Sequence, residues 1–347
     1  MKRILIIRLS SLGDVLLATP LIRQLRQKYP QVQLDFLVRK EYAELLRHHP
    51  GLSELIEFDA QPGFTSLQKI REKIHQTRYD IILDIHNNLR SRYLCAGLPF
   101  LSFFKTRLYR IHKNQIFRFL LVIFKINLYH KIYSRVIPVW EKYLQTARSL
   151  GIIAEDGRLE LFLPEEAITA AQNFRAALEK SKWDIVMAPG ARHFSKRWPE
   201  EYFVELIKQL FAKTGLRTIL VGGAEDISMI EKILRQLQEG MAVSSVGKLS
   251  LLETAALIKQ SKLMISNDSG LMHLGAALDV PLIAIFGSTV KELGFFPNSP
   301  KAVVVENGGL YCRPCSHTGR SDCPEKHFRC MREITPENIL SILLQKL

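Results

Sequence analysis

Asp14 stands where an α/β protein could use a carboxylate for chemistry. It follows an apolar run, Ile4–Leu9, and a short polar turn, and it precedes a helical pattern over Val15–Lys28. Ligands of open α/β sheets bind outside the carboxyl ends of the strands, and an ionised carboxylate there can act as a general base. A helix start also favours the ionised form. The alternative is that Asp14 only supplies the negative charge that is common in first helical turns.

Two turns in the second half of the chain carry side chains suited to binding a nucleotide. The first of these turns contains Gly190, which allows the backbone to turn closely, and its cations could bind a phosphate. These cations are Arg192, Lys196 and Arg197. The second turn offers a carboxylate, Glu225 or Asp226, to the hydroxyls of a ribose.

A third turn ends an apolar run and opens a helix at Ser269 and Gly270. Free N–H groups at such a helix start form an anion site, and His273 lies one turn later on the same helix face. The alternatives are that Asp268 is a helix N-cap and that His273 is a packed, hydrogen-bonded histidine. The chain contains no GxGxxG pattern and no P-loop pattern, so neither a dinucleotide enzyme nor a P-loop ATPase is indicated.

Strands alternate with helices along most of the chain, which is typical of parallel α/β domains. The predicted strands of the first half are Ile4–Leu9, Gln33–Val38, Leu55–Phe58 and Ile81–Ile85. Those of the second half are Asp184–Ala188, Thr218–Val221, Ala242–Ser245, Leu263–Ser266, Leu282–Phe286 and Ala302–Val305. A length of 347 residues suits two domains, so we expect two Rossmann-like halves that face a cleft.

The domain boundaries follow from these two series of strands. We expect an N-terminal domain over residues 1–163, a connector over 164–182 and a C-terminal domain over 183–334. A final helix over 335–347 begins with Thr335 and Pro336, which suit a helix start. This helix is expected to pack back toward the N-terminal domain.

The net charge of +14 is concentrated in one part of the chain. No acidic residue occurs between Asp84 and Glu141, and ten Lys and Arg residues are interleaved there with aromatic residues in a segment that we expect to be mostly helical and partly irregular. The cations considered for acceptor or membrane binding are Arg107, Arg110, Lys113 and Arg118. Such segments are attracted to anionic lipid surfaces and phosphorylated ligands. The alternatives are nucleic acid, which we do not expect, and a solvated helix face beside core aromatics.

The N-terminus lacks the long apolar region of a signal peptide, and the run Phe119–Phe124 is far too short to span a membrane. We therefore expect a cytoplasmic protein.

Four of the five cysteines crowd together as Cys312-x2-Cys315-x7-Cys323-x6-Cys330. Four thiols in such a cluster can close a structural zinc or iron site. The alternatives are reduced cysteines packed as small apolar groups and a disulfide, which cytoplasmic redox conditions disfavour.

Together, these features resemble glycosyltransferase family nine, the ADP-heptose:lipopolysaccharide heptosyltransferases. The segments that carry the resemblance are Arg8–Leu16, Tyr79–His86, Leu89–Ser91, Lys196–Glu200, Val221–Glu225 and Asn267–His273, in the order of the family. The resemblance implies a GT-B fold, with the acceptor on the first domain and the nucleotide sugar on the second. It implies an inverting, metal-independent transfer of heptose from ADP-heptose to the lipopolysaccharide inner core. The acceptor is then a lipid A–core molecule at the inner membrane, with the enzyme peripheral on its inner face.

The same resemblance implies roles for single residues. Asp14 matches the catalytic base, and Lys196 matches the lysine that neutralises the leaving pyrophosphate. Glu225 matches the ribose position. The residues that match the turn for diphosphate and sugar are Asp268, Ser269, Gly270 and His273. No cofactor is implied for transfer, and the cysteine cluster should not be needed for it. Two alternatives stay open, a transferase of the same fold that uses another nucleotide sugar and a non-catalytic, membrane-associated nucleotide-sugar binder.

Overall fold

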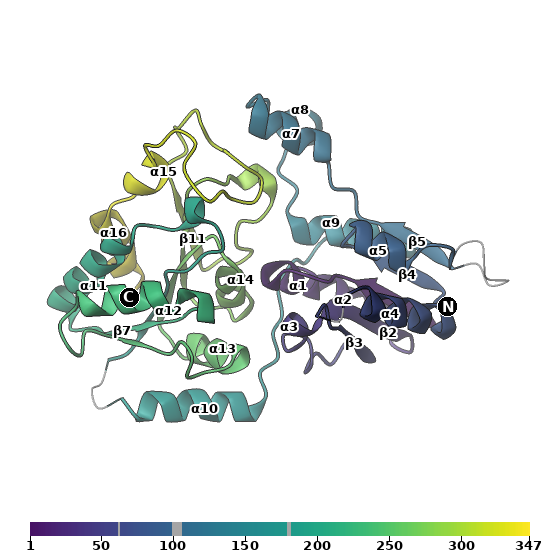
Figure 1. Ribbon diagram of the computed structural model, residues 1–347, viewed down its shortest axis with the longest axis horizontal. Helices are drawn as coiled ribbons and strands as arrows, with labels where there is room; N and C mark the ends of the chain where they lie inside the picture. Colours follow the sequence, from purple (N-terminus) through teal and green to yellow (C-terminus); the bar gives the residue numbers. More distant parts are fainter. Residues whose placement is uncertain (62, 99–105, 179–181) are drawn as a thin grey trace. The chain divides into compact units, whose positions relative to one another are not determined.

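The computed structural model describes residues 1–61, 63–98, 106–178 and 182–347, and the chain divides into two compact units (Figure 1). The first unit comprises Met1–Lys113 and Val139–Phe162, and the second comprises Asn114–Pro138 and Leu163–Leu347. Parts of the predicted basic segment (99–105) and of the predicted connector (179–181) lie outside the described residues. Among the described residues, no helix is long and apolar enough to cross a membrane.

The first unit is built on a parallel sheet whose strands run in the order β3-β2-β1-β4-β5. These strands are β1 Arg3–Ile7, β2 Gln33–Arg39, β3 Glu54–Phe58, β4 Ile81–Asp84 and β5 Arg107–Arg110. The central strand β1 pairs Ile4 with Leu34 on one side and with Ile81 on the other. Every residue of β1 after Arg3 is buried, as expected for a parallel strand that is covered on both faces. The strands predicted for this half are confirmed.

The first unit also contains helices, most of which connect these strands. They are α1 Leu12–Leu16, α2 Thr19–Lys28, α3 Lys40–Ala43, α4 Phe64–Thr77, α5 Leu89–Leu94 and α9 Val139–Thr146, with a 3-10 turn η1 at Arg148–Leu150. The single helix predicted over Val15–Lys28 is wrong, because α1 ends at Leu16 and a second helix begins at Thr19. Pro20 lies in the first turn of α2, where its missing N–H breaks no helical hydrogen bond, and this favours a new start there.

Strand β5 is a second departure from the sequence prediction, which expected this segment to be mostly helical. It pairs with β4 from Ile81 opposite Arg107 to Asp84 opposite Arg110. The strand lies at the edge of the sheet, where charged side chains discourage pairing with another chain. A four-residue strand with arginine at both ends carries too little apolar alternation to be recognised in the sequence.

The second unit is built on a parallel sheet with the order β11-β10-β9-β6-β7-β8. Its strands are β6 Ile185–Ala188, β7 Thr218–Leu220, β8 Ala242–Ser244, β9 Leu263–Asn267, β10 Leu282–Phe286 and β11 Ala302–Glu306. The strands predicted for this half are confirmed. Because neighbouring parallel strands end at the same edge of a sheet, the turns that follow β10, β9, β6 and β7 lie next to one another.

Helices and short 3-10 turns complete the second unit. They are α7 Gln115–Ile123, α8 Leu128–Tyr133, α10 Glu165–Ala176, η2 Phe194–Lys196, α11 Glu200–Thr214, η3 Ala224–Asp226, α12 Ile227–Arg235, α13 Leu251–Lys259, α14 Gly270–Ala277, η4 Lys291–Leu293, α15 Arg329–Arg332 and α16 Pro336–Lys346. Helix α10, from the predicted connector, packs against α13, and α16 packs against α11. The predicted packing of the final helix toward the N-terminal domain stays a prediction.

The segment Asn114–Pro138 groups with the second unit, whereas the sequence placed it in the N-terminal domain. The cause is a small apolar cluster in which Leu121 of α7 and Tyr129 of α8 pack with Leu293 of η4. These side chains are far apart in the sequence, so no local pattern indicates their contact.

Candidate active site

Asp14 lies in the first turn of α1 in the first unit, where three side chains hold its carboxylate. Arg8, which follows β1, places Nη2 2.7 Å from Asp14 Oδ2. The hydroxyl of Ser11 donates to the same oxygen at 3.0 Å, and the hydroxyl of Tyr143 from α9 donates to Oδ1 at 3.0 Å. Arg8 is itself fixed by a hydrogen bond from Nη1 to the carbonyl of Ile85 at 2.9 Å.

The surroundings of Asp14 favour its ionised form. Burial acts to raise the pKa of Asp14, but the Arg8 charge and the hydrogen bonds from Ser11 and Tyr143 outweigh it, and the pKa lies below its ordinary value. The side chain of Asp14 keeps 15% of its surface exposed. An ionised carboxylate that still reaches solvent can accept a proton from a bound molecule, so the general-base prediction has the required chemistry.

The turn after β4 lies beside Arg8 and is held by Asp84, which is fully buried. Asp84 accepts hydrogen bonds from the Ser91 hydroxyl at 2.9 Å and the Asn87 N–H at 2.7 Å, and Arg110 Nε lies 3.4 Å from it. Arg110 therefore has a structural role in addition to any part in binding. Burial, followed by the Arg8 charge, lowers the pKa of His86 in this turn to about 3, so its imidazole is neutral.

Lys196 and Asp268 meet at the carboxyl edge of the second sheet. Lys196 Nζ lies 2.7 Å from Asp268 Oδ2, and the hydroxyl of Thr289, from the turn after β10, donates to the same oxygen. Asn267 links the turns after β9 and β6, because its Nδ2 donates to the carbonyl of Pro189 at 2.7 Å. The structure thus brings together residues that the sequence places more than 70 positions apart.

The start of α14 follows Asp268 directly. Ser269 is the N-cap and Gly270 the first helical residue, so backbone N–H groups at this end have no partner within the helix. Such groups can bind an anion. His273 is 4% exposed, which agrees with the packed-histidine alternative. The structure therefore places Asp268, Ser269 and Gly270 at the edge of the sheet, and His273 inside the unit.

Gly190, in the turn after β6, lies directly against the side chain of Asp226, in the turn after β7. A Cβ atom at Gly190 would lie 2.3 Å from Asp226 Oδ1. Asp226 is 6% exposed and accepts the N–H of Gly223 at 3.0 Å, while the neighbouring Glu225 is exposed. Asp226 thus holds the turn, and Glu225 is the acid of the two that is free to face a ligand.

Replacing Gly190 by Ala is expected to destabilise the protein by about 1–3 kcal/mol, because the new methyl group must displace a buried, hydrogen-bonded carboxylate. Gly308→Ala is the matched control, because a Cβ at Gly308 meets nothing within 4 Å. Denaturant unfolding of both variants measures the effect. Equal stability of the two variants would contradict the close fit.

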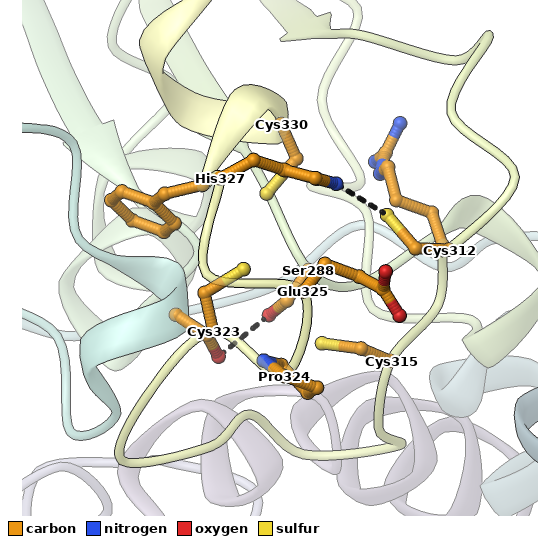
Figure 2. Close-up of a pocket in the computed structure, with 11 residues that line it drawn as sticks. Ser288, Cys312, Cys315, Cys323, Pro324, Glu325, His327 and Cys330 are labelled. Carbon is orange, nitrogen blue, oxygen red and sulfur yellow. Dashed lines mark hydrogen bonds between the residues drawn. The ribbon is translucent and has the colours of Figure 1, made fainter.

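The other predicted binding residues are dispersed. Arg192 is exposed, and Arg197 Nε donates to the carbonyl of Ala191 at 2.7 Å. The cations Arg107, Arg110 and Lys113 belong to the first unit, and Arg118 belongs to the second. The cysteines Cys312, Cys315, Cys323 and Cys330 line one small cavity in the second unit (Figure 2).

Sequence reasoning did not single out several residues that hold the candidate site. Arg8 lies in a segment that carries the family resemblance, and its distance of six residues from Asp14 could have suggested an ion pair. Tyr143 comes from α9, 129 residues after Asp14, and Thr289 comes from a turn with no recognised motif. Neither contact has a local signal in the sequence.

The sequence and the fold of the chain are similar to those of known proteins. The sequence model of glycosyltransferase family 9 (heptosyltransferase) matches residues 67–326. Lipopolysaccharide heptosyltransferase 2 of Escherichia coli K12 is 27% identical over 364 aligned positions, covering 99% of each chain. A solved family 9 glycosyl transferase of Veillonella parvula has a TM-score of 0.80 at 22% identity, covering 99% of this chain and 97% of its own. E. coli ADP-heptose lipopolysaccharide heptosyltransferase II has a TM-score of 0.74 at 25% identity, covering 100% and 98%.

Two Rossmann-like units, each built on a parallel sheet, are the GT-B fold of these structural neighbours. The family match covers most of the sequence, and the chain belongs to glycosyltransferase family 9. The fold and the enzyme class predicted from the sequence are therefore confirmed.

Proposed function

We propose that this enzyme transfers heptose from ADP-heptose to the inner core of lipopolysaccharide, with inversion at the anomeric carbon. The observation that carries the proposal is the ionised, partly exposed carboxylate of Asp14, which Arg8 and Tyr143 hold in place. The similarity to lipopolysaccharide heptosyltransferase 2, which extends over nearly the whole chain, supports the choice of donor and acceptor.

In the proposed reaction Asp14 is the general base. Its carboxylate takes the proton of the acceptor hydroxyl while that hydroxyl oxygen forms a bond to the anomeric carbon of heptose. The bond from this carbon to the ADP oxygen breaks, and the electron pair leaves with ADP. Because the new bond forms on the face opposite the leaving group, the configuration inverts. Arg8 and Tyr143 act as positioning residues for the carboxylate.

Lys196 and the start of α14 stabilise the departing diphosphate. Lys196 supplies a cation, and the N–H groups at Ser269 and Gly270 supply donors to the phosphate oxygens. The pair with Asp268 keeps the ammonium next to this helix start. These groups offset the negative charge of the departing diphosphate, which a metal ion neutralises in other transferases. The proposed transfer therefore needs no metal ion. Glu225 is proposed to bind the ribose hydroxyls.

The decisive experiment incubates the protein with ADP-heptose and a Kdo–lipid A acceptor and measures the acceptor by mass spectrometry. We expect a gain of one heptose and equimolar release of ADP. A screen of other nucleotide sugars in the same assay tests the alternative donor. Transfer from one of these and none from ADP-heptose would reject the proposed donor, and ADP binding without any transfer would favour a non-catalytic binder.

An exposed apolar surface on α7 suits an enzyme whose acceptor is a lipid. One face of the helix buries Leu121, whereas Ile116, Phe119 and Ile123, spaced three and four residues apart, are 71%, 57% and 58% exposed. Phe124 extends this surface. Contiguous exposed apolar side chains of this size mark interaction sites, and we call these four residues the α7 surface.

The charge of the sequence segment that contains the α7 surface indicates the partner. The nearest acidic residues in the sequence are Asp84 and Glu141, and the segment between them is cationic. Anionic lipid headgroups attract such a segment while apolar side chains enter the interface. A second copy of this chain would place like charges together. We therefore propose that the α7 surface binds the anionic inner face of the membrane and that the protein is peripheral there.

Replacing Phe119 and Ile123 together by Ser is expected to lower binding to vesicles of phosphatidylethanolamine and phosphatidylglycerol at least about tenfold, since each side chain loses its burial in lipid. ADP binding should stay at the wild-type level. Ile153→Ser is the control, because Ile153 is 67% exposed but lies in the first unit. Flotation of both variants measures the difference. Wild-type vesicle binding by the double variant would favour the solvated helix face.

Charge reversal in the same assay tests the cations. Arg107→Glu and Lys131→Glu change exposed residues of the acid-free segment, and each cation contributes about 1 kcal/mol near an anionic surface. Arg110 is unsuited to this test because it neighbours the buried carboxylate of Asp84. We expect the charge variants to bind anionic vesicles no better than neutral vesicles.

A further inference from the structure

The loop between Gly309 and Met331 brings four cysteines around one small cavity. The cavity has a volume of about 20 Å³ and is lined by Cys312, Cys315, Cys323 and Cys330. Figure 2 shows the four sulfur atoms around the same space, and all four thiols are free. A cavity of this size holds about one water molecule, so it has room for a single ion and none for an organic ligand.

His327 supports one of these sulfur atoms. Its Nδ1 accepts the N–H of Arg329 at 3.0 Å, which leaves Nε2 to carry the proton of the neutral ring. Nε2 lies 3.9 Å from Cys312 Sγ and can donate to it. An N–H donor to sulfur stabilises a thiolate, so the histidine acts as a positioning residue and the donor set consists of four sulfur atoms.

Cations lie close to this donor set. Arg313 lines the same cavity as the four cysteines, and its Nη2 pairs with Glu306 at 2.6 Å. Lys125 Nζ donates to the backbone carbonyl of the first cysteine of the cluster at 3.2 Å. Lys125 and Arg313 place positive charge beside a centre that would carry a double negative charge, since four thiolates surround a divalent ion.

We propose that Cys312, Cys315, Cys323 and Cys330 bind one thiolate-preferring metal ion, zinc or iron, and that the metal-held loop fixes the two turns that carry Lys196 and Asp268. Sulfur ligands in tetrahedral arrangement select these metals. In the conformation described here, no three His, Cys, Asp or Glu side chains of the described ranges are arranged to hold an ion. Ligation therefore requires the thiols to turn about their Cα–Cβ bonds toward the shared cavity.

The loop contacts the turn that carries Lys196. The Arg320 N–H donates to Ser195 Oγ at 2.8 Å, and the Arg320 carbonyl accepts the N–H of Ser195 at 3.1 Å. Ser195 directly precedes Lys196. Gly319 comes so close to this turn that a Cβ there would lie 2.5 Å from His193 Cβ. Release of the loop would therefore free the backbone next to Lys196.

The loop also contacts the turn that supports Asp268. The Cys315 N–H donates to the carbonyl of Ser288 at 3.3 Å, and Arg313 Nη2 donates to the carbonyl of Thr289 at 2.7 Å. The Thr289 hydroxyl in turn donates to Asp268. Both members of the Lys196–Asp268 pair are thus connected to the metal loop by short chains of hydrogen bonds. The effect on donor binding rests on the proposed function.

Metal analysis tests the site without reference to activity. Protein purified without a histidine tag under anaerobic conditions is expected to carry about one equivalent of zinc or iron per chain, and elemental analysis tells the two metals apart. Cys95→Ala, which removes a buried thiol of the first unit, should keep the metal. The double variant Cys315→Ser and Cys323→Ser should lose it. Less than about a tenth of an equivalent in the wild type after incubation with Zn²⁺ and with Fe²⁺, with all four thiols titratable, would overturn the proposal.

A second measurement avoids variants that fail to fold. Metal-free wild-type protein titrated with Co²⁺ should develop the visible absorption of a tetrahedral cobalt–thiolate centre and saturate at about one equivalent. Absence of these bands together with loss of free thiols would identify a disulfide and reject the metal site.

ADP titration tests the connection to the donor turns. Removing the metal with a chelator is expected to weaken ADP binding at least about fivefold, and adding the metal back should restore it. An unchanged ADP affinity in the metal-free protein would reject this connection. Failure of the metal-loaded wild type to bind ADP would contradict the proposed function instead, and the metal analysis would still stand.

Discussion

Replacing Asp14 by Asn should lower turnover by a factor of about 10²–10⁴, the usual contribution of a general base, with ADP binding near the wild-type level. Asparagine keeps the size of the side chain and can still accept a hydrogen bond from Tyr143, but it cannot take the acceptor proton. Because the base acts only during the reaction, the loss should appear in kcat. Steady-state kinetics with saturating ADP-heptose measures it.

Two controls separate chemistry from folding in this variant. Asp14→Asn leaves Arg8 without its ion-pair partner, so thermal unfolding must show that the variant is folded at the assay temperature. Asp156→Asn removes another acid of the first unit, one paired with Arg23 at 3.1 Å, and should retain wild-type turnover. Wild-type turnover in Asp14→Asn would remove this residue from the mechanism.

The pH dependence of the same reaction follows from the lowered pKa of Asp14. The carboxylate is the active form, so activity is present above the folded-state pKa and falls as the pH drops through it. Because Arg8 holds this pKa below the ordinary value, the acid limb of kcat/KM should lie below about pH 4. The carboxylate also stabilises the fold above the unfolded pKa, and that stability is lost over the same acid range. An acid limb near neutral pH would indicate another base.

Replacing Lys196 by Ala should reduce kcat/KM by roughly 10- to 100-fold, as expected for the loss of a charge-assisted hydrogen bond of about 1.5–3 kcal/mol. The ammonium meets the diphosphate both in the bound donor and as it departs, so ADP affinity and kcat should fall together. The variant also leaves Asp268, which is 5% exposed, without its cation, while the hydrogen bond from the Thr289 hydroxyl remains.

Lys301→Ala is the matched control for this prediction. Lys301 is a half-exposed lysine of the same unit that pairs with Asp279 at 2.6 Å, and its loss should leave the kinetics unchanged. Mg²⁺ should not restore activity to Lys196→Ala. Restoration by Mg²⁺ would show that a metal takes part in leaving-group chemistry and would contradict the proposed mechanism.

The sequence predicted most of the sheet framework because buried parallel strands are short, almost continuous apolar runs. β1, β4, β6, β9 and β10 all show this pattern. β5 lacks it, since its arginines suit an exposed edge. The division between α1 and α2 depends on Pro20 in a first helical turn, and the apolar residues on both sides continue the helical period across the break.

In the candidate site, too, some residues could be predicted from the sequence and others could not. Asp14, Lys196 and Asp268 follow strands directly, so their place at a carboxyl edge could be predicted. The groups that set their chemistry come from elsewhere in the chain. Tyr143 reaches Asp14 only because α9 packs on α2, and Thr289 reaches Asp268 because β10 neighbours β9. Such contacts depend on tertiary packing, which a periodic pattern does not contain.

The chain enters the second unit at Asn114, returns to the first at Val139 and enters the second again at Leu163. This path constrains the order in which the two units can be completed during synthesis. The first unit has its last segment once residue 162 has emerged, but α7 and α8 bury Leu121 and Tyr129 against residues as late as Phe295. At about 5–20 residues per second, translation of the intervening chain takes on the order of ten seconds. During that interval both faces of α7 are apolar and uncovered. The nascent chain therefore offers ribosome-bound chaperones, and the membrane itself, a larger apolar target than the finished enzyme does.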